Sequence, residues 1–448
     1  MIQINQDAQR AHPHQDAQLH ILQHALAAVD PAALIGQRLE VNDHMLAMDD
    51  LRVSLLDRKI WIIAIGKASI PMAETVQSLL GADRVADAVA VIGKGTGTIT
   101  NTLRVIEAGH PLPEGTVGAD AVAHLSQRVG PGDLVLCLLS GGGSAMLASP
   151  PDGISSSELS HMTQLLLQSG ATIDEVNTVR RHVSRLQGGQ LMGLLSPASV
   201  ITLVLSDVLG DRLESIASGP TVPDPTSFAD AWDVIRRVGL LDRIPLSIRA
   251  HLLSGVKGAI ADTLKPGNQA FDTAQTVLLG NNQTAVDALA LAARSRGFVV
   301  HRCPRPLVGE ARAVGIDLAK QARRLAASAS TRWALIAGGE TTVAVRGDGR
   351  GGRNQELALS AAIELEGIEG VSLASLATDG IDGITQAAGA LVDGQTVALA
   401  QEQGMDPQDA LARNDSHDLL DATADLLWTG PTHTNVADVV LVLGEPRA

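Results

Sequence analysis

Tyrosine is absent from the 448 residues of this chain, and aromatic residues make up only 2% of it, although hydrophobic residues make up 45%. A core of this composition must be built from Leu, Val, Ile and Ala. The 44 glycines suit βαβ units, in which helices approach a sheet closely. A chain of this length is longer than a domain with a single hydrophobic core usually is. We therefore expect an α/β protein with two domains.

Other scarcities narrow the class of protein. There are two cysteines, Cys137 and Cys303, both in apolar, strand-like contexts, which predicts reduced thiols of a cytoplasmic protein. No apolar run approaches the roughly 20 residues of a membrane span, and the N-terminus lacks a secretory pattern. With 34 basic and 49 acidic residues, the net charge is −15. That balance disfavours nucleic acid and anionic membranes as partners, so an anionic substrate would need a local cationic site.

The order of apolar and polar segments predicts where the domains lie. Residues 1–18 are polar and are predicted to be a disordered tail. Short, mainly apolar runs follow, most of them leading into Gly, Ser or Asp, which is typical of parallel strands covered on both faces. These runs are residues 60–65, 88–92, 134–139, 200–205, 277–279, 333–337, 372–377 and 437–443. We predict a Rossmann-like parallel-sheet domain over 19–243 and a smaller α/β domain over 244–448, with function at the carboxyl ends of strands.

The strongest local motif is a glycine loop after the apolar run 134–139, formed by Ser140, Gly141, Gly142, Gly143 and Ser144. Backbone N–H groups without side chains can converge on phosphate oxygens, and the two serines add donors. A tight turn is the alternative, but a turn needs only one glycine. Lys67 ends the first run in the sequence GKAS, where a strand end meets a helix N-terminus and favours an anion. A solvated loop lysine is the alternative reading, and no GxxxxGK[ST] motif occurs.

Two arginines and an aspartate extend this set. The segment 177–190 is predicted to be a helix on which Arg181 and Arg185 lie one turn apart. Like charges at that spacing repel, so an anionic partner is indicated, with a solvated basic face or internal ion pairs as the alternative. Asp207 follows the run 200–205 and suits a metal ligand or general base. A helix cap or turn would use the same residue type.

The second half offers three further polar residues near predicted strand ends. Glu340 lies in GGETT, Arg353 begins a predicted helix after GDGRGG, and Asp379 lies in ATDGIDG. The Arg353 fork could clamp a phosphate alongside free backbone N–H groups. Asp379 suits Mg²⁺ coordination or proton abstraction, with an Asx turn as the alternative. Cations, carboxylates and a glycine cradle are together the inventory of phosphoryl transfer.

The chain resembles the glycerate 2-kinases, whose C-terminal part is called the MOFRL domain. The matching blocks are IGKAS, HPLPEGT, LSGGGSA, NTVRRHVSRLQGG, SDVLGDRLESIASGPT, GGETTV, GRGGRNQE and ATDGIDG, in family order. The resemblance implies a Rossmann-like N-terminal domain, a MOFRL region over about 330–445, and an active site in the cleft between the domains. Relatives usually carry lysine where this chain has Gln187.

The resemblance also implies an activity and roles for residues. The implied reaction is phosphorylation of D-glycerate at its 2-hydroxyl by ATP with Mg²⁺, giving 2-phosphoglycerate. Lys67, Arg353 and Asp379 would be catalytic, and Asp207 and Glu340 would match acidic metal-binding positions. The glycine loop, Arg181 and Arg185 would bind phosphate or substrate. The oligomeric state stays open, with a homodimer as one candidate.

Two other classes of function compete with the kinase. Members of the family also carry the name hydroxypyruvate reductase, so an NAD(P)H-dependent reductase is the first alternative. Such an enzyme needs GxGxxG at the first strand–helix turn, where this chain has GKAS. A non-catalytic ligand-binding protein is the second alternative, against which the joint presence of Lys67, Arg353 and Asp379 argues.

Overall fold

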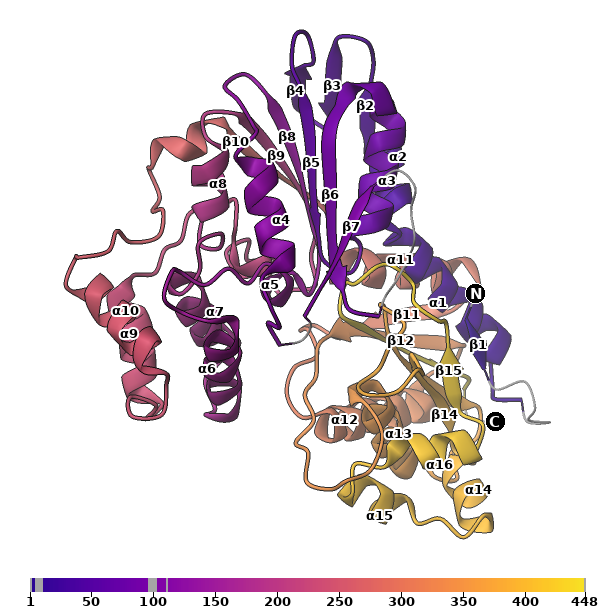
Figure 1. Ribbon diagram of the computed structural model, residues 1–448. Coiled ribbons are helices and arrows are strands. Elements are labelled where there is room, and N and C mark those ends of the chain that lie inside the picture. The colour runs from indigo at the N-terminus through magenta and orange to yellow at the C-terminus, as the bar shows by residue number, and fades with distance from the viewer. Residues whose placement is uncertain (1, 5–10, 96–102, 110–111, 447–448) are drawn as a thin grey trace. The chain divides into compact units, whose positions relative to one another are not determined.

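The computed structural model describes residues 2–4, 11–95, 103–109 and 112–446 (Figure 1). The chain divides into two compact units: a contiguous unit, Pro31–Leu279, and a discontinuous unit, Met1–Asp30 with Gly280–Ala448. The predicted boundary between residues 243 and 244 therefore falls inside the contiguous unit. The reason is that strand β10 (Ala274–Gly280) joins the first sheet beside β9 (Ser199–Leu205).

The contiguous unit is built on a six-stranded sheet in the order β10-β9-β8-β5-β6-β7, in which β5 pairs in parallel with β6 and β8, and β8 with β9. Its strands β5 (Ile60–Ile65) and β8 (Leu134–Leu139) are buried along their whole length, as the apolar runs predict. A three-stranded antiparallel sheet, β2-β3-β4, accompanies it. The remaining elements are α2 (Pro31–Arg38), β2 (Leu39–Val41), β3 (Met45–Met48), β4 (Leu51–Ser54), α3 (Ser69–Leu80), η1 (Ala82–Arg84), β6 (Val85–Gly93), β7 (Arg104–Ala108), α4 (Val117–Ser126), α5 (Gly143–Met146), α8 (Gln190–Leu195), η2 (Ile216–Ser218) and η3 (Gln269–Thr273).

Two hydrophobic cores stabilise this unit. Helices α4 and α8 pack on the sheet face that carries Trp61, Ile63 and Ile65. The second core lies among four helices set apart from the sheet in Figure 1, and Val176, Val179 and Phe228 contribute to it. These helices are α6 (Ser156–Gln168), α7 (Ile173–His182), α9 (Phe228–Arg237) and α10 (Leu246–Val256). Capping boxes begin α6, α7 and α9, so the sequence fixes where each of them starts.

The discontinuous unit holds a seven-stranded mixed sheet in the order β1-β15-β14-β13-β16-β12-β11. Among the described strands of this sheet, only β11 and β12 pair in parallel, and β16 runs antiparallel to both β12 and β13. Its elements are β1 (Gln3–Ile4), α1 (Gln15–Ala28), α11 (Asn282–Ser295), β11 (Val299–Arg302), α12 (Ala311–Ser328), β12 (Trp333–Gly339), α13 (Arg353–Leu365), β13 (Val371–Ala377), β14 (Gly389–Asp393), α14 (Thr396–Glu402), α15 (Pro407–Ala412), α16 (Ser416–Ala422), β15 (Leu426–Trp428) and β16 (Asp438–Gly444).

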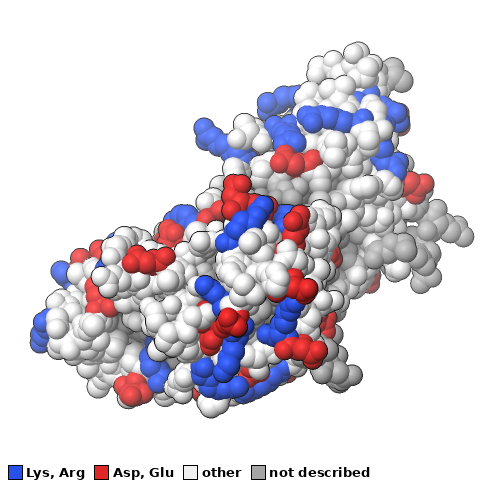
Figure 2. Space-filling model, turned by 90° about the horizontal axis from the view of Figure 1, so that it is seen from above, with Lys and Arg blue, Asp and Glu red and all other residues white. Residues whose placement is uncertain are grey.

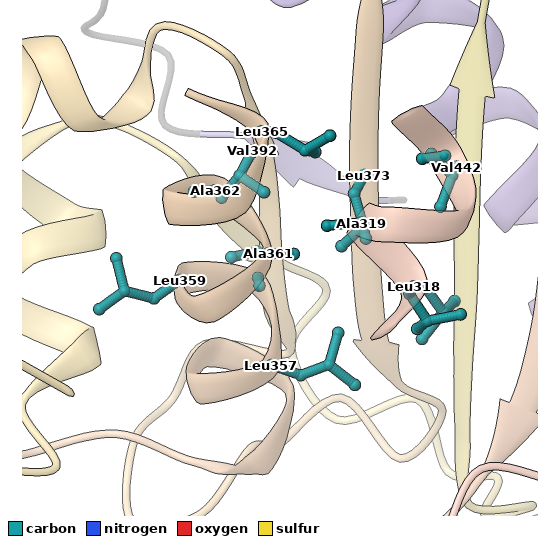
Figure 3. Close-up of a cluster of buried hydrophobic side chains, with 14 of the residues drawn as sticks. Leu318, Ala319, Leu357, Leu359, Ala361, Ala362, Leu365, Leu373, Val392 and Val442 are labelled. Atoms are coloured by element: carbon teal, nitrogen blue, oxygen red, sulfur yellow. The ribbon is translucent and has the colours of Figure 1, made fainter. Parts of the chain in front are cut away.

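The core of this unit forms where α12 and α13 pack against the sheet. Figure 3 shows Leu318 and Ala319 of α12 beside Leu373 of β13 and Val442 of β16. The two helices approach closely at Gly315, where an added Cβ would lie under 3.0 Å from the Leu357 carbonyl oxygen. A glycine at that position is therefore a packing requirement.

The N-terminal segment differs from the predicted tail. Strand β1 pairs with β15, and the His12 ring lies between two buried carboxylates, 2.9 Å from Asp393 and 3.2 Å from Asp425. Gln18 is fully buried and donates to the carbonyl oxygens of Ser372 and Leu441. Composition indicates disorder here because the partners that satisfy these polar groups lie far away in the sequence. Residues 5–10 of the predicted tail lie outside the described residues.

Among the described residues, no single helix is long and apolar enough to cross a membrane. The pair α1 and α2, interrupted between them, reaches the required length and hydropathy only when the two are taken together. Charged side chains of both signs are intermixed on the face shown in Figure 2. Exposed ion pairs such as Arg212–Asp174 and Arg413–Asp409 bring opposite charges together. Exposed pairs of this kind contribute little to the stability of the fold.

Candidate active site

The predicted residues of the contiguous unit follow three adjacent strands at one edge of its sheet. Lys67 follows β5, Ser140 follows β8, and Asp207 follows β9. These strands are neighbours and run parallel, so their carboxyl ends meet at the same edge. The carboxyl edge of a parallel sheet is where α/β proteins place their ligands. Three of the predicted segments therefore lie at the same edge of the sheet, because each of them directly follows one of three neighbouring parallel strands.

The lysine loop and the glycine loop hold each other in place. The Lys67 backbone N–H donates to the Gly141 carbonyl oxygen (3.0 Å), and the Ala68 N–H donates to Ser140 Oγ (3.0 Å). A Cβ on Gly66 would lie 2.7 Å from the Ser140 carbonyl carbon. The glycine of GKAS is therefore needed for the close approach of the two loops. Ser140 is fully buried and supports the loop from beneath.

The glycine loop has the geometry of an oxyanion cradle. Gly142 adopts a left-handed φ of 85°, and a Cβ on Gly143 would lie 2.7 Å from Ala217 Cβ. In the described part of the structure, the N–H groups of Gly141, Gly142, Gly143 and Ser144 donate to no other group. Successive unpaired amides around a left-handed residue form a concavity that suits anions.

A second layer of residues behind the loop was not predicted from the sequence. Ser218 Oγ donates to Ser144 Oγ (2.9 Å) and lies 3.3 Å from Asn177 Oδ1. Gln187 Nε2 donates to the Ser144 carbonyl oxygen (2.8 Å). Gln187 therefore holds the loop itself, which explains how an uncharged residue serves at this position. The motif NTVRRHVSRLQGG contains both Asn177 and Gln187, but its spacing does not reveal that Asn177 meets Ser218 and Gln187 meets Ser144.

The backbone that carries Ser218 is strained. Ala217, Ser218 and Gly219 adopt left-handed φ values of 50°, 59° and 62° in succession. For the two residues with a Cβ, this conformation costs on the order of 1–3 kcal/mol each, and such strain gathers at functional sites. The strain aims the Ser218 hydroxyl at Ser144 and Asn177.

The prediction of one helix over 177–190 is wrong. Helix α7 ends at His182, because Ser184 Oγ accepts the N–H groups of Leu186 and Gln187 and turns the chain. Gly188 and Gly189 then adopt left-handed φ values of 60° and 79°. Arg181 and Arg185 therefore do not lie one turn apart on a common helix.

The two predicted arginines occupy contrasting environments. Arg181 is buried, with Nε 3.0 Å from Asp224 Oδ1 and its Nη groups donating to the Glu214 carbonyl oxygen and Thr226 Oγ1. Arg185 is half exposed and contacts the fully exposed Asp152 at 3.4 Å. The contacts of Arg181 are those of an arginine that joins α7 to the loops around it.

In the discontinuous unit, the predicted residues Arg353 and Glu340 meet a third residue, Asp438, at one end of the sheet. Arg353 donates from Nε and Nη2 to both carboxylate oxygens of Asp438 (2.6 and 3.0 Å) and from Nη1 to Glu340 (2.7 Å). Asp438 begins β16, opposite Gly339 of β12. Because β16 runs antiparallel, its first residue comes to the edge where the neighbouring strands end. The sequence predicted this strand but gave its first residue no role.

Burial and charge act in opposite directions on this pair. Burial raises the pKa of the Asp438 carboxyl to about 6, even though the Arg353 guanidinium lowers it. Burial would lower the pKa of Arg353, but Asp438 and Glu340 together raise it above its ordinary value. Arg353 is therefore held as a cation, in a bidentate geometry that fixes its orientation.

Asp382 occupies the N-terminus of α13. Its carboxylate accepts the N–H groups of Asn354 (3.0 Å) and Gln355 (2.9 Å). Burial raises the pKa of Asp382, against the hydrogen bonds that lower it. The backbone N–H groups expected to bind a ligand beside Arg353 are thus used by the protein. The glycines before α13 serve close packing, since a Cβ on Gly352 would meet the Asp382 carboxyl.

Asp379 follows β13 and forms an Asx turn, which the sequence predicted as the alternative to a catalytic role. Its Oδ1 accepts the Ile381 N–H (3.2 Å), and its carbonyl oxygen accepts the Thr432 N–H (3.3 Å). The side chain is partly exposed, and one carboxylate oxygen is committed by the turn. An Asx turn of this kind fixes the orientation of the carboxylate.

The predicted metal ligands belong to different units, Asp207 to the contiguous one and Glu340 to the discontinuous one. Within the described residues, no group of three or more His, Cys, Asp or Glu side chains could hold a metal ion. A self-contained protein cage is therefore not present there. Mg²⁺ commonly uses one or two carboxylates together with waters and substrate phosphates.

Two family models match the chain. One, described as Domain of unknown function (DUF4147), matches residues 17–253, and the MOFRL family matches residues 333–438. The chain is 37% identical over 431 residues to a glycerate 2-kinase of Pyrococcus horikoshii, covering 95% of this chain and 96% of that protein. It is 42% identical over 394 residues to a D-glycerate 2-kinase of Thermotoga maritima, covering 87% and 91% respectively.

The similarity extends to solved structures. The crystal structure of a glycerate kinase from Thermotoga maritima matches with a TM-score of 0.81 and 37% identity, over 96% of this chain and 99% of that one. Two relatives from Agrobacterium vitis, 38% and 39% identical over 85% of this chain, carry a provisional hydroxypyruvate reductase name.

Proposed function

Because the chain belongs to the glycerate kinase family, we propose that it transfers the terminal phosphoryl group of ATP to the 2-hydroxyl of D-glycerate. The hydroxyl oxygen forms a bond to the γ-phosphorus, the bond to the β–γ bridging oxygen breaks, and ADP and 2-phosphoglycerate leave. The observation that carries the proposal is similarity to glycerate 2-kinases along 95% of the chain. The oxyanion cradle at Gly141–Ser144 adds chemical support.

The contiguous unit supplies groups that stabilise negative charge. The unpaired amides of the glycine loop would donate to phosphoryl oxygens, with the hydroxyls of Ser140 and Ser144 supporting the loop. We assign Lys67 the role of neutralising charge that builds up during transfer. Its backbone is fixed to Gly141, so the lysine and the loop keep a constant spacing. Arg181 and Arg185 keep a supporting role in this proposal, through the packing of α7 and through a surface charge.

The discontinuous unit supplies a base and an oriented cation. We assign Asp379 the role of orienting the 2-hydroxyl and accepting its proton, with the carboxylate held by the Ile381 N–H. Arg353 would neutralise phosphoryl charge. Its bonds to Asp438 and Glu340 use three of its five N–H donors. A guanidinium held in this way loses little further freedom when it binds a ligand.

The residues fit a nucleotide with its metal ion. The donors of the glycine loop suit phosphate oxygens, and Asp207 at the end of β9 is a hard oxygen ligand of the kind Mg²⁺ prefers. Glu340 is a second carboxylate candidate, although it also accepts a hydrogen bond from Arg353. When bound, Mg²⁺ supplies charge neutralisation on the nucleotide phosphates.

The reductase alternative finds less support. The turn between β5 and α3 consists of Gly66, Lys67 and Ala68, and Gly66 packs against Ser140. A dinucleotide-binding turn would place glycines there so that the backbone can approach a pyrophosphate. The chain instead places a cation at this turn.

One assay decides between the two activities. The purified chain, given D-glycerate, ATP and Mg²⁺, is expected to release ADP, and ³¹P NMR is expected to identify 2-phosphoglycerate as the product. The matched reaction contains hydroxypyruvate and NADPH or NADH without nucleotide triphosphate. Reduced-cofactor oxidation without ADP release in the first reaction would favour the reductase, and 3-phosphoglycerate as the product would refute the 2-position.

A further inference from the structure

Arg180 differs from the other two arginines of its segment. Arg181 contacts Asp224, and Arg185 contacts Asp152. Among the described residues, by contrast, the Arg180 guanidinium has no hydrogen bond and no ion pair. Its side chain is nevertheless partly buried near the C-terminal end of α7. The described residues therefore surround a partly buried cation without supplying a counter-charge for it.

This arrangement is unfavourable for the free protein. Burial lowers the pKa of Arg180 to about 10, with no carboxylate nearby to oppose the effect. The guanidinium still carries its charge at neutral pH. A charge removed from water is stabilised only when an opposite charge or hydrogen-bond acceptors replace the lost solvation. For Arg180, a bound anion would supply those acceptors.

The position of Arg180 connects it to the glycine loop. It lies three residues after Asn177, and side chains at this spacing share one face of a helix. Asn177 contacts Ser218, and Ser218 contacts Ser144 of the glycine loop. The strained segment of Ala217, Ser218 and Gly219 thus lies between this face of α7 and the loop.

We propose that Arg180 binds an oxyanion of the reactants on the α7 side of the glycine loop. A guanidinium can donate two parallel hydrogen bonds to one carboxylate or one phosphate. The ligand is therefore either the carboxylate of the hydroxy acid or a phosphate of the nucleotide. The identity of the reactants rests on the proposed function, whereas the anion-binding role of Arg180 rests on its contacts and burial.

The kinetic test uses two substitutions of Arg180 and one control. Arg180→Gln removes the charge, and Arg180→Lys keeps the charge but loses the fork. The control is Arg236→Gln on α9, an exposed arginine paired with the exposed Asp233. The Gln variant is expected to raise one KM about tenfold to a hundredfold, the loss expected for hydrogen bonds to a charged group. The Lys variant should recover part of this loss, and the control should match the wild type.

The two KM values identify the source of the anion. A rise in the KM for D-glycerate alone assigns Arg180 to the carboxylate, and a rise in the KM for ATP alone assigns it to a phosphate. An additional measurement needs no turnover: millimolar inorganic phosphate should raise the thermal midpoint of the wild type more than that of Arg180→Gln. If neither KM moves by more than about threefold and phosphate stabilises both proteins equally, the proposal is overturned.

Thermal stability separates this role from a structural one. Because Arg180 loses no partner on substitution, Arg180→Gln is expected to unfold at the same or a higher temperature than the wild type. Arg181→Gln, which strands the buried Asp224, is expected to unfold at a lower temperature. A similar loss of stability in both variants would assign Arg180 a structural role and refute the proposal.

Failure of the proposed function would look different. A wild-type chain that phosphorylates no hydroxy acid would refute the kinase but leave the phosphate comparison between wild type and Arg180→Gln intact. An active wild type together with a fully active Arg180→Gln variant would leave the kinase standing and remove only the role of Arg180.

Discussion

Lys67 shows how one residue is fixed by its neighbours in the fold. Its backbone N–H is bonded to Gly141, and the preceding Gly66 packs directly on Ser140. The lysine is thereby set beside the glycine loop with no freedom at its Cα. A cation placed in this way can stabilise charge in a transition state without reorganisation.

Lys67→Met is therefore expected to lower kcat by about two to three orders of magnitude, since it removes a positioned cation but keeps the length of the side chain. Steady-state assays with D-glycerate and ATP measure the effect. Lys94→Met serves as the control, because Lys94 is exposed and pairs with the exposed Glu114. A Lys67→Met variant within about threefold of the wild type would refute the role.

His182 determines in which direction the stability of the fold changes with pH. Burial lowers the pKa of His182 below its ordinary value of 6.5, although Asp224 and Asp262 act in the opposite sense. The unfolded chain therefore binds more protons than the folded chain just below pH 6.5. Stability is fully present above that pH and is lost as the pH falls toward the pKa of the folded state.

We expect the free energy of unfolding to decline less steeply below pH 6.5 in His182→Gln than in the wild type. Urea titrations at several pH values between about 5 and 8 measure this slope. His417, a buried histidine whose pKa is also lowered, does not belong to the unit that contains His182; its titration contributes to both proteins and cancels in the comparison. Identical slopes would show that His182 does not titrate differently in the folded and unfolded states.

For single residues, the sequence predicted which motifs matter better than it predicted which distant residues those motifs contact. Glycine and lysine after a buried strand could be placed, because both residue types have a clear reason to be there. Asp438 and Asn177 could not be placed, since their importance comes from Arg353 and Ser218, which lie far from them in the sequence. The sequence indicated a role for Arg181 and none for Arg180, because the contacts of Arg181 with Asp224 and Thr226 cannot be read from the motif.

At the scale of elements, apolar runs were reliable where a strand is buried on both faces. Residues 60–65 and 134–139 coincide with β5 and β8, and 333–337 lies within β12. The prediction of a helix to residue 190 was wrong, because apolar spacing continued past the turn that Ser184 and Gly188 impose. Strand β15 has three residues, too few to show a period in the sequence.

The close contact between α12 and α13 predicts that Gly315 does not tolerate a larger side chain. In Gly315→Ala, the new Cβ would meet the Leu357 carbonyl oxygen, which is backbone and cannot move aside easily. Overpacking of this kind costs about 1–3 kcal/mol, which exceeds the helix propensity of about 1 kcal/mol gained from alanine. We therefore expect a lower midpoint of unfolding.

Gly36→Ala is the matched control for this prediction. Gly36 also lies in a helix, α2, but an added Cβ would meet nothing within 4 Å. This variant is expected to gain up to about 1 kcal/mol, measured by the same urea titration. If Gly315→Ala and Gly36→Ala changed the free energy of unfolding by the same amount and in the same direction, the packing geometry at Gly315 would be contradicted.

At the scale of the whole molecule, the N-terminal segment is an integral part of the discontinuous unit. In His12→Ala, the buried carboxylates of Asp393 and Asp425 lose the ring between them. Leaving a buried polar group without one of its partners costs about 1–3 kcal/mol. His24→Ala on the exposed side of α1 should change stability by no more than about 0.5 kcal/mol.

The two histidine variants are compared by their midpoints of urea unfolding. A His12→Ala protein as stable as His24→Ala would mean that the N-terminal segment contributes nothing to the stability of the unit. The sequence could not predict this segment, because its polar composition is that of a tail and its partners lie far along the chain. The separation is 354 residues for Gln18 and Ser372 and 381 residues for His12 and Asp393.

The discontinuous unit has a consequence for synthesis on the ribosome. Its first segment emerges before Pro31, but the strands that it pairs with follow Gly280. At roughly 5–20 residues per second, the nascent N-terminus must wait tens of seconds for its partners. The contiguous unit is complete during that interval and is free to fold co-translationally. The N-terminal segment can therefore reach its native pairing only after the strands beyond Gly280 have been translated.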